Sequence, residues 1–243
     1  MDIKTVNKLL RSELKPLLLQ EGFVSSASKK FWRYHEDRID VVSLQHPNSH
    51  GAAVLGCTTY SFFVNIGCYL LDVPYVYDDM KEGSKGLRPG EEHCHFRRRL
   101  ERGIEQDENF QAQLWSIVAD EHRAKDSIKD ACDVIERTAI PWFSRFENKE
   151  ETLRILIEEE PTFENGLCAS KDSCVRNSLI GYIASAMGDA VLARKHLEAA
   201  LDTGFTSDRD AERMHLELNK LASREPDTPH QRGSAAGASA PRR

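Results

Sequence analysis

The chain has no long hydrophobic run. None of its 243 residues belongs to a stretch that approaches the roughly 18 apolar residues of a membrane span. The longest apolar run near the N-terminus is Leu17–Leu19, which is too short for the core of a signal peptide. We therefore expect a cytosolic protein without a membrane partner. Hydrophobic residues make up 40% of the chain and charged residues 30%, which is typical of a globular protein that buries its own core.

Signatures of metal centres and of common catalytic sites are missing as well. The six cysteines include no Cys-x-x-Cys pair, so neither a zinc ribbon nor a thioredoxin-type redox motif is indicated, and we expect reduced thiols. The sequence has no HExxH, GxSxG, Walker A or GxGxxG motif. It therefore predicts no catalytic residues, no metal and no cofactor. It favours a non-enzymatic protein, although it leaves the question of catalysis open.

A basic balance of charge is also lacking. The chain holds 33 Lys and Arg residues against 39 Asp and Glu residues, which gives a net charge of -6. Proteins that bind nucleic acids in general carry a basic balance or a clear basic patch. The acidic chain disfavours that class and suits association with a basic partner.

Two periodicities divide the chain. Apolar residues at helical spacing between residues 3 and 18 predict an N-terminal helix, which Pro16 kinks or divides. Alternation over 31–35, 38–45 and 60–70 predicts three strands, because successive side chains of a strand point to opposite faces. Helical spacing returns from about residue 110 and predicts a long helix that ends before Pro141, including Ile117 in its apolar stripe.

The remainder of the chain is predicted to be helical. Asn148 is suited to cap a helix that Pro161 closes. Residues 178–205 predict a helical hairpin that turns at Gly188-Asp189, and a last helix begins at Ser207 or Asp208.

The last residues are rich in Pro, Gly, Ser and Ala and have no apolar face, which predicts disorder. The whole pattern predicts an α+β fold, in which an antiparallel sheet of four or five strands packs against helices and an all-helical part follows. The expected boundaries are 1–146 for the sheet domain, 147–224 for a helical cap and 225–243 for the disordered tail.

A resemblance to a known family rests on six motifs in a fixed order, LLLQEGF, FWRY, RIDVVSLQH, YSFFVNIGCYL, HCHFRRRL and IPWF. Together they resemble the domain of unknown function 4304 family over roughly Met1–Phe146. The resemblance implies a small α+β domain whose antiparallel sheet packs against helices. It implies no catalytic residues, because the function of that family is not known.

A second, local resemblance lies in SLIGYIASAMGDAVLARKHLEAAL, which is similar to a single tetratricopeptide repeat. The resemblance places five small or apolar residues where the two helices of a repeat touch. A solenoid needs about three repeats, so we expect this unit to pack on the first domain. The five residues are Gly181, Gly188, Ala193, Leu197 and Ala200.

The most unusual run is HCHFRRRL, which spans His93–Leu100. Read as a strand, it has one mostly apolar face and one basic face, with Arg98 as an exception on the apolar face. The histidine pair His93 and His95 could ligate a metal ion, but the neighbouring arginines would repel a cation. Arginine forks suit phosphate or carboxylate groups, unless the acids of this chain cover them. The residues expected to bind a ligand or partner on this surface are Arg97, Arg99, His93, His95, Arg33, Gln45, Asn65 and Tyr69.

The leading hypothesis is a non-enzymatic cytosolic protein of a bacterium that binds another protein through the polar sheet face or the helical cap. A more specific version is an immunity-type protein that neutralises a basic toxin, by general analogy. The alternative is a protein that binds an anion or a nucleic acid with the basic strand face. The oligomeric state is not determined by the sequence.

Overall fold

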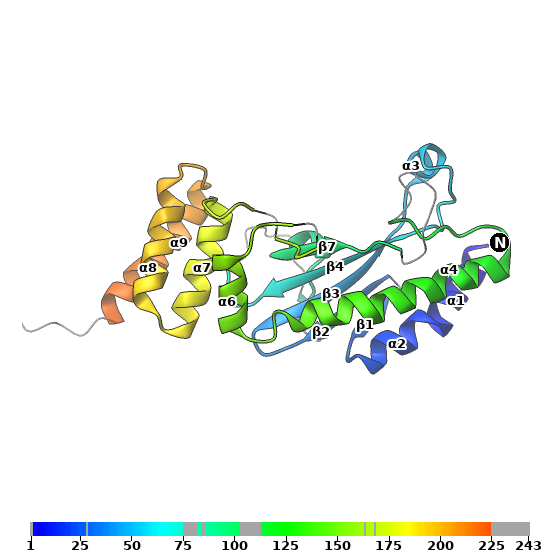
Figure 1. The fold of residues 1–243 in the computed structure, drawn as a ribbon, viewed down its shortest axis with the longest axis horizontal. Coiled ribbons are helices and arrows are strands. Elements are labelled where there is room, and N and C mark those ends of the chain that lie inside the picture. Colours follow the sequence, from blue (N-terminus) through cyan, green and yellow to red (C-terminus); the bar gives the residue numbers. More distant parts are fainter. Residues whose placement is uncertain are drawn as a thin grey trace, which may run out of the picture.

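A five-stranded antiparallel sheet forms the centre of the protein, in the order β1-β2-β3-β4-β7. The computed structural model describes residues 2–27, 29–74, 82–83, 86–102, 113–162, 164–167 and 169–224. The predicted α+β fold is confirmed (Figure 1). The strands of the sheet are β1 Val24–Ala27, β2 Lys30–Tyr34, β3 Arg38–Gln45, β4 Phe63–Leu70 and β7 Phe96–Arg99.

Helices pack along one face of this sheet (Figure 1). Val42, Ile66 and Phe96 point from three strands into the same core as Leu18 and Ile128 of the covering helices. Burying these side chains is the main favourable term for the fold, at about 1.5–3 kcal/mol for a large apolar residue. The covering elements are α1 Ile3–Ser12, α2 Leu14–Gln20, α4 Glu121–Val134, a π-helical turn Ile135–Ala139 and α5 Ile140–Ser144.

The first helical segment is divided as predicted. The break falls at Glu13, and Pro16 lies in the first turn of α2, where a backbone N–H has no partner within the helix. Between the second and third predicted strands, the chain forms the short helix α3, Ser49–Val54. Asn48 caps this helix by accepting a 2.7 Å hydrogen bond from the backbone N–H of Gly51.

The long helix differs from its prediction at both ends. It begins at Glu121, because Asp120 accepts a hydrogen bond from the backbone N–H of Arg123 and caps it. Ile117 therefore precedes the helix, in a segment where the backbone of Trp115 pairs with that of Phe62. The prediction that Ile117 belongs to the helix is wrong.

The helix also continues past Pro141. Pro141 lacks a backbone N–H, and the π-helical turn Ile135–Ala139 lies directly before it, so the hydrogen-bonding pattern changes without ending the helix. The chain leaves the helix only at Arg145, after Trp142 and Phe143 have entered the core. The predicted end before Pro141 is therefore wrong.

Part of the other sheet face is covered by the segment that precedes β7. Trp32 donates a 2.8 Å hydrogen bond to the carbonyl of Pro89, and the hydroxyl of Tyr34 donates to the carbonyl of Leu87. A second, smaller apolar cluster lies beneath this segment, which contains the short strands β5 Glu82–Gly83 and β6 Gly86–Leu87 and the 3-10 helix Glu91–His93. The buried residues of this cluster are Trp32, Ile39, Val41, Tyr69 and Cys94.

The C-terminal helices α6–α9 lie at one end of the sheet (Figure 1). Asn148 caps α6 and Gly188 takes a left-handed conformation with φ 84° at the hairpin turn, both as predicted. The close contact expected at Gly181 is also confirmed, because a Cβ atom there would lie 2.6 Å from Cγ of Leu197. The helices are α6 Lys149–Glu158, α7 Cys174–Met187, α8 Ala190–Asp202 and α9 Asp208–Arg224.

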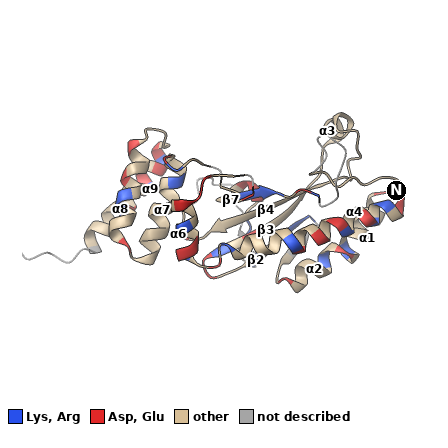
Figure 2. Cartoon of the chain, in the orientation of Figure 1, with Lys and Arg blue, Asp and Glu red and all other residues tan. Residues whose placement is uncertain are grey.

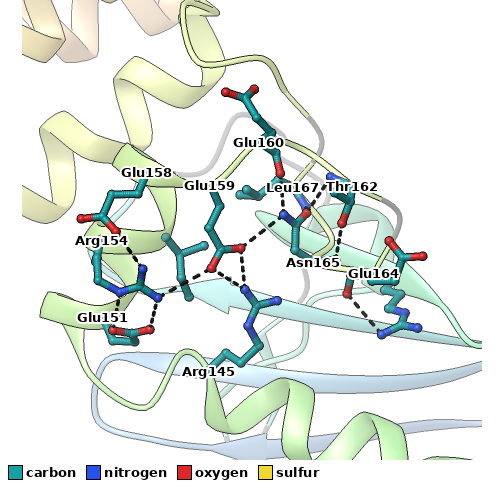
Figure 3. Close-up of polar contacts among 12 residues, drawn as sticks. Arg145, Glu151, Arg154, Glu158, Glu159, Glu160, Thr162, Glu164, Asn165 and Leu167 are labelled. Carbon is teal, nitrogen blue, oxygen red and sulfur yellow. Dashed lines mark hydrogen bonds and ion pairs between the residues drawn. The ribbon is translucent and has the colours of Figure 1, made fainter.

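A polar network joins these helices to the rest of the protein (Figure 3). Arg145, directly after α5, donates to both carboxylate oxygens of Glu159 at 2.8 and 2.6 Å. Asn165 donates to Glu159 and to the carbonyl of Glu160. Arg98, at the edge of the sheet, donates 3.2 Å to the carbonyl of Glu164. The segment after α6 is thus held against the sheet.

Arg176 fixes α7 to the end of α6. The residue is 1% exposed, and its guanidinium donates to the carbonyls of Ile155, Leu156 and Glu159. The carbonyl of Ile155 also accepts from the backbone N–H of Glu159, whereas Leu156 lies in the last turn of α6, where carbonyls have no partner within the helix. A cation at a helix C-terminus is also stabilised by the helix dipole. The side chain therefore connects two helices that are separated by a loop.

In the described part of the chain, no helix is both long enough and apolar enough to cross a bilayer. The cysteines within this part are free thiols. Figure 2 shows charges of both signs along α4 and basic residues on β7. The predicted tail 225–243 lies outside the described residues.

Candidate functional site

The predicted strand over His93–Leu100 is shorter in the structure. β7 begins at Phe96, and His93 ends a 3-10 helix. The Nδ1 atom of His93 accepts a 3.0 Å hydrogen bond from the backbone N–H of Gly90, and this local bond holds a turn in place of a strand. His93 therefore does not belong to the basic row, and that part of the prediction is wrong.

His95 pairs with β4 but is not basic. Its Nδ1 atom accepts a 2.9 Å hydrogen bond from the backbone N–H of Leu70. Burial lowers the pKa of His95 to about 4, so the ring is neutral and Nε2 carries the proton. His93 and His95 each use a ring nitrogen to accept from the backbone, and the described residues contain no group of three or more metal-ligating side chains.

Tyr69 is part of the smaller apolar cluster. Its side chain is 4% exposed and packs against the ring of His95, with the ring centroids 4.9 Å apart. Burial raises the pKa of Tyr69 to about 12. The prediction that Tyr69 lines an open polar surface is wrong, because the segment before β7 covers this part of the sheet.

Arg33 lies on the opposite face of the sheet from Arg97. It pairs in register with Asp40, which pairs with Cys68 on the face that the helices cover. The side chain forms 2.9 and 2.8 Å contacts with the carboxylate of Asp40 and stacks on Phe23 at 4.9 Å. The prediction that Arg33 shares one surface with Arg97 is therefore wrong.

The other four predicted residues do share a face. Arg99 donates 2.9 Å from Nε to Oδ1 of Asn65 and 2.7 Å from Nη2 to Oε1 of Gln45. Asn65 in turn donates 3.0 Å to Gln45, and the guanidinium of Arg99 lies 4.5 Å from the ring centroid of Phe63. Arg97 is exposed and donates to the carbonyl of Glu92. We call Arg99, Asn65, Gln45 and Phe63 the amide–arginine cluster.

A pocket between the sheet and the C-terminal helices was missed by sequence reasoning. It encloses about 170 Å³, and most of its walls are apolar. We call it the junction pocket. Four separate segments of the chain line it, so no local pattern could have revealed it. The residues used below are Val73, His95, Val175, Leu179, Phe205 and Met214.

Polar residues form the smaller part of the lining surface of this pocket, and besides His95 and one ion pair they are Ser178, Tyr182, Thr206 and Ser207. His95 lines it, and its Nε2–H is the ring donor that is left after Nδ1 has accepted from Leu70. Asp210 and Arg213 form an ion pair at 3.6 Å and neutralise one another at the wall. A mostly apolar hollow without net charge, with a histidine donor and a few hydroxyl-bearing residues in its lining, is suited to an uncharged group.

The fold and its sites define an α+β protein with an all-helical C-terminal part and a small apolar pocket where the two meet. The family described as "Domain of unknown function (DUF4304)" matches residues 14–145. This is more than half of the chain, so the chain belongs to that family. Comparison with curated proteins and with solved structures finds no match. The matched range ends before α6, so the junction pocket combines the family domain with helices outside it.

Proposed function

We propose that this protein is a non-enzymatic interaction module, and that a partner protein inserts one large apolar side chain into the junction pocket. The volume of the pocket carries the proposal. Its 170 Å³ compares with an engineered apolar cavity of about 150 Å³ that binds benzene. Sites for small-molecule ligands and cofactors usually measure about 300–1,000 Å³. The size therefore favours one side chain over a whole cofactor.

The rim of the pocket supports the same proposal. Phe205 is 90% exposed and Val175 is 56% exposed, and both line the pocket. Large aromatic side chains that surround a small pocket are typical of the centre of a protein interface. A partner that fills the pocket would cover both residues and remove their apolar surface from water.

Charge indicates what surrounds the inserted side chain. The chain has a net charge of -6, whereas Asp210 and Arg213 neutralise each other in the pocket wall. A complementary partner therefore carries Lys or Arg residues around an uncharged apolar side chain, because long-range attraction speeds association. A basic toxin neutralised in the bacterial cytosol is the specific form of this partner that we propose.

Two valines on neighbouring helices allow a matched test. Val175→Asp places a charge in the pocket wall, and Val191→Asp places the same charge on a residue that is 81% exposed and outside the pocket lining. Peptides are selected from a random displayed library on the wild-type protein. Their affinities for both variants are then measured by calorimetry.

We expect the selected peptides to share one large apolar residue flanked by Lys or Arg. Val175→Asp should weaken their binding at least about tenfold, and Val191→Asp should leave it within about twofold. The same dependence should hold for a protein captured from a lysate of the native host. Equal binding to both variants, or selected peptides without an apolar residue, would contradict the proposal.

A second candidate function is the binding of an anion or a nucleic acid by the basic face of β7. The amide–arginine cluster favours it, because Arg99 is held by amide oxygens and not by carboxylates. However, only Arg97 and Arg99 remain of the predicted basic row, whereas DNA-binding proteins commonly contact about 6–10 phosphates. Fluorescence anisotropy with labelled single-stranded DNA at low salt tests this function. Saturable binding that is lost in the Arg97→Ala, Arg99→Ala double variant would support it.

A further inference from the structure

One edge of the Arg99 guanidinium is already occupied. A guanidinium presents one pair of parallel N–H donors from Nε and Nη2, and a second pair from Nη1 and Nη2. In Arg99 the first pair meets Oδ1 of Asn65 at 2.9 Å and Oε1 of Gln45 at 2.7 Å. These acceptors are neutral amides, so they orient the guanidinium and leave its positive charge in place.

An aromatic ring and two fixed amide groups also hold the guanidinium of Arg99 in place. Its centre lies 4.5 Å from the ring centroid of Phe63, which is a favourable cation–π arrangement. Asn65 is only 3% exposed and donates 3.0 Å to Gln45, so both amides are fixed by a hydrogen bond of their own. The side chain of Arg99 is therefore already ordered in the free protein, and ligand binding costs little additional conformational entropy.

The second edge of Arg99 remains open. Among the residues that the structure describes, no hydrogen-bond acceptor contacts Nη1 of Arg99, and no carboxylate forms an ion pair with this side chain. Arg97, two residues earlier on the same face, differs, because it donates to the carbonyl of Glu92. Arg99 thus presents an oriented, positively charged pair of donors at the surface.

We propose that this open edge of Arg99 is a binding site for a carboxylate group. Two parallel donors match the two coplanar oxygens of a carboxylate, and such bidentate pairs are among the strongest hydrogen bonds in proteins. A single arginine neutralises one negative charge, which suits a carboxylate better than a phosphate with nearly two charges. The carboxylate belongs either to a free small acid or to an acidic residue of a protein.

The site is independent of the junction pocket. The amide–arginine cluster lies at Phe63, where β4 begins, whereas the pocket lies beyond Leu70, where β4 ends. Seven residue steps of a strand separate these ends by about 24 Å. A failure at one site therefore does not imply a failure at the other.

The experiment uses the side-chain NMR signals of Arg99, Asn65 and Gln45 in the full chain. Three probes are titrated at low ionic strength: sodium acetate, a hexaglutamate peptide and inorganic phosphate. The key variant is Arg99→Lys, which keeps the charge and removes the paired donors, and Arg97→Lys is the matched control. Thermal unfolding of both variants checks that the fold is intact.

We expect saturable shifts of the Arg99 signals with acetate and with hexaglutamate, and weaker binding of phosphate. Arg99→Lys should weaken carboxylate binding about tenfold, and Arg97→Lys should leave it within about twofold. Hexaglutamate binding much tighter than acetate assigns the carboxylate to an acidic protein segment, and equal affinities assign it to a small acid. Absence of saturable shifts, tighter binding of phosphate, or unchanged binding in Arg99→Lys would overturn the proposal.

Discussion

The backbone N–H of Leu70 donates a 2.9 Å hydrogen bond to Nδ1 of His95, and this bond fixes the neutral form of the ring. Nδ1 can accept only when it carries no proton, so the proton of the neutral ring is on Nε2. The histidine thereby joins the end of β4 to the wall of the junction pocket.

The free energy of unfolding should decrease as the pH is lowered, because of His95. Burial lowers the pKa of His95 from its ordinary value of 6.5 to about 4. Above pH 6.5 neither the folded nor the unfolded state holds this proton. Between pH 6.5 and 4 the unfolded state binds it more strongly, so folding loses roughly 3 kcal/mol across this range. The free energy of unfolding in urea, measured at pH 7.5 and 4.5, tests this.

His95→Asn provides the comparison, because an asparagine Oδ1 can replace the Nδ1 acceptor and does not titrate in this range. We expect this variant to lose most of the pH dependence that is specific to His95. His50→Asn, which changes an exposed histidine on α3, should retain it. The same pH dependence in His95→Asn and wild type would contradict the assignment.

Asp40 should be one of the most sensitive residues in the sheet. Its buried carboxylate contacts Arg33 at 2.8 Å, Arg38 at 3.2 Å and His35 at 2.8 Å. Asp40→Asn removes the negative charge, which leaves Arg33 without a counter-ion and Arg38 with only the more distant carboxylate of Asp37, and should cost about 3–5 kcal/mol. Asp37→Asn removes a carboxylate that is partly exposed and 3.7 Å from Arg38, and should cost less than about 1 kcal/mol. Urea unfolding measures both, and a similar loss in the two variants would show that burial does not decide the effect.

Two arginines that contact α6, Arg176 of α7 and Arg154 within α6 itself, should differ strongly in their effect on stability. Arg176→Met removes the donors to the carbonyls of Leu156 and Glu159 and one of the two donors to the carbonyl of Ile155, and should cost roughly 3 kcal/mol because these acceptors lose a partner. Arg154→Met breaks ion pairs with Glu151 and Glu158 whose side chains are 40–61% exposed, and should cost less than about 1 kcal/mol. Chemical denaturation followed by circular dichroism compares them. A larger loss in Arg154→Met would refute this account of the junction.

The α7–α8 hairpin should not tolerate a methyl group at its crossing. A Cβ atom at Gly181 would lie 2.6 Å from Cγ and 2.7 Å from Cδ2 of Leu197. Gly181→Ala is therefore expected to destabilise the protein by about 1–3 kcal/mol, in spite of the higher helix propensity of alanine. Ser178→Ala, on a half-buried position of the same helix, should stay within about 0.5 kcal/mol. A stabilised Gly181→Ala variant would show that Leu197 moves freely.

The sequence predicted local structure well where one strong signal acts. Asn148 and Gly188 mark a helix start and a turn through their own backbone chemistry, and both predictions are confirmed. Alternation also separated Phe96 from Arg97 and Arg99 correctly, because neighbouring side chains of a strand always point to opposite faces. His93 was misplaced because a hydrogen bond from Gly90 competes with the strand.

Relations between segments were beyond the sequence. Arg33 and Arg97 alternate in the same way within their own strands, and only the register through β3 and β4 places them on opposite faces. Tyr69 looked like a surface residue because nothing local indicates that the segment before β7 covers it.

By itself, then, the sequence determined the α+β order of elements, their caps and the two faces of each strand, since these depend on residues a few positions apart. The tertiary structure decided which faces meet. It assembled Arg99, Asn65 and Gln45 from three strands, and it formed the junction pocket from four segments between Val73 and Met214. Contacts between distant residues depend on register and packing, which no local pattern encodes.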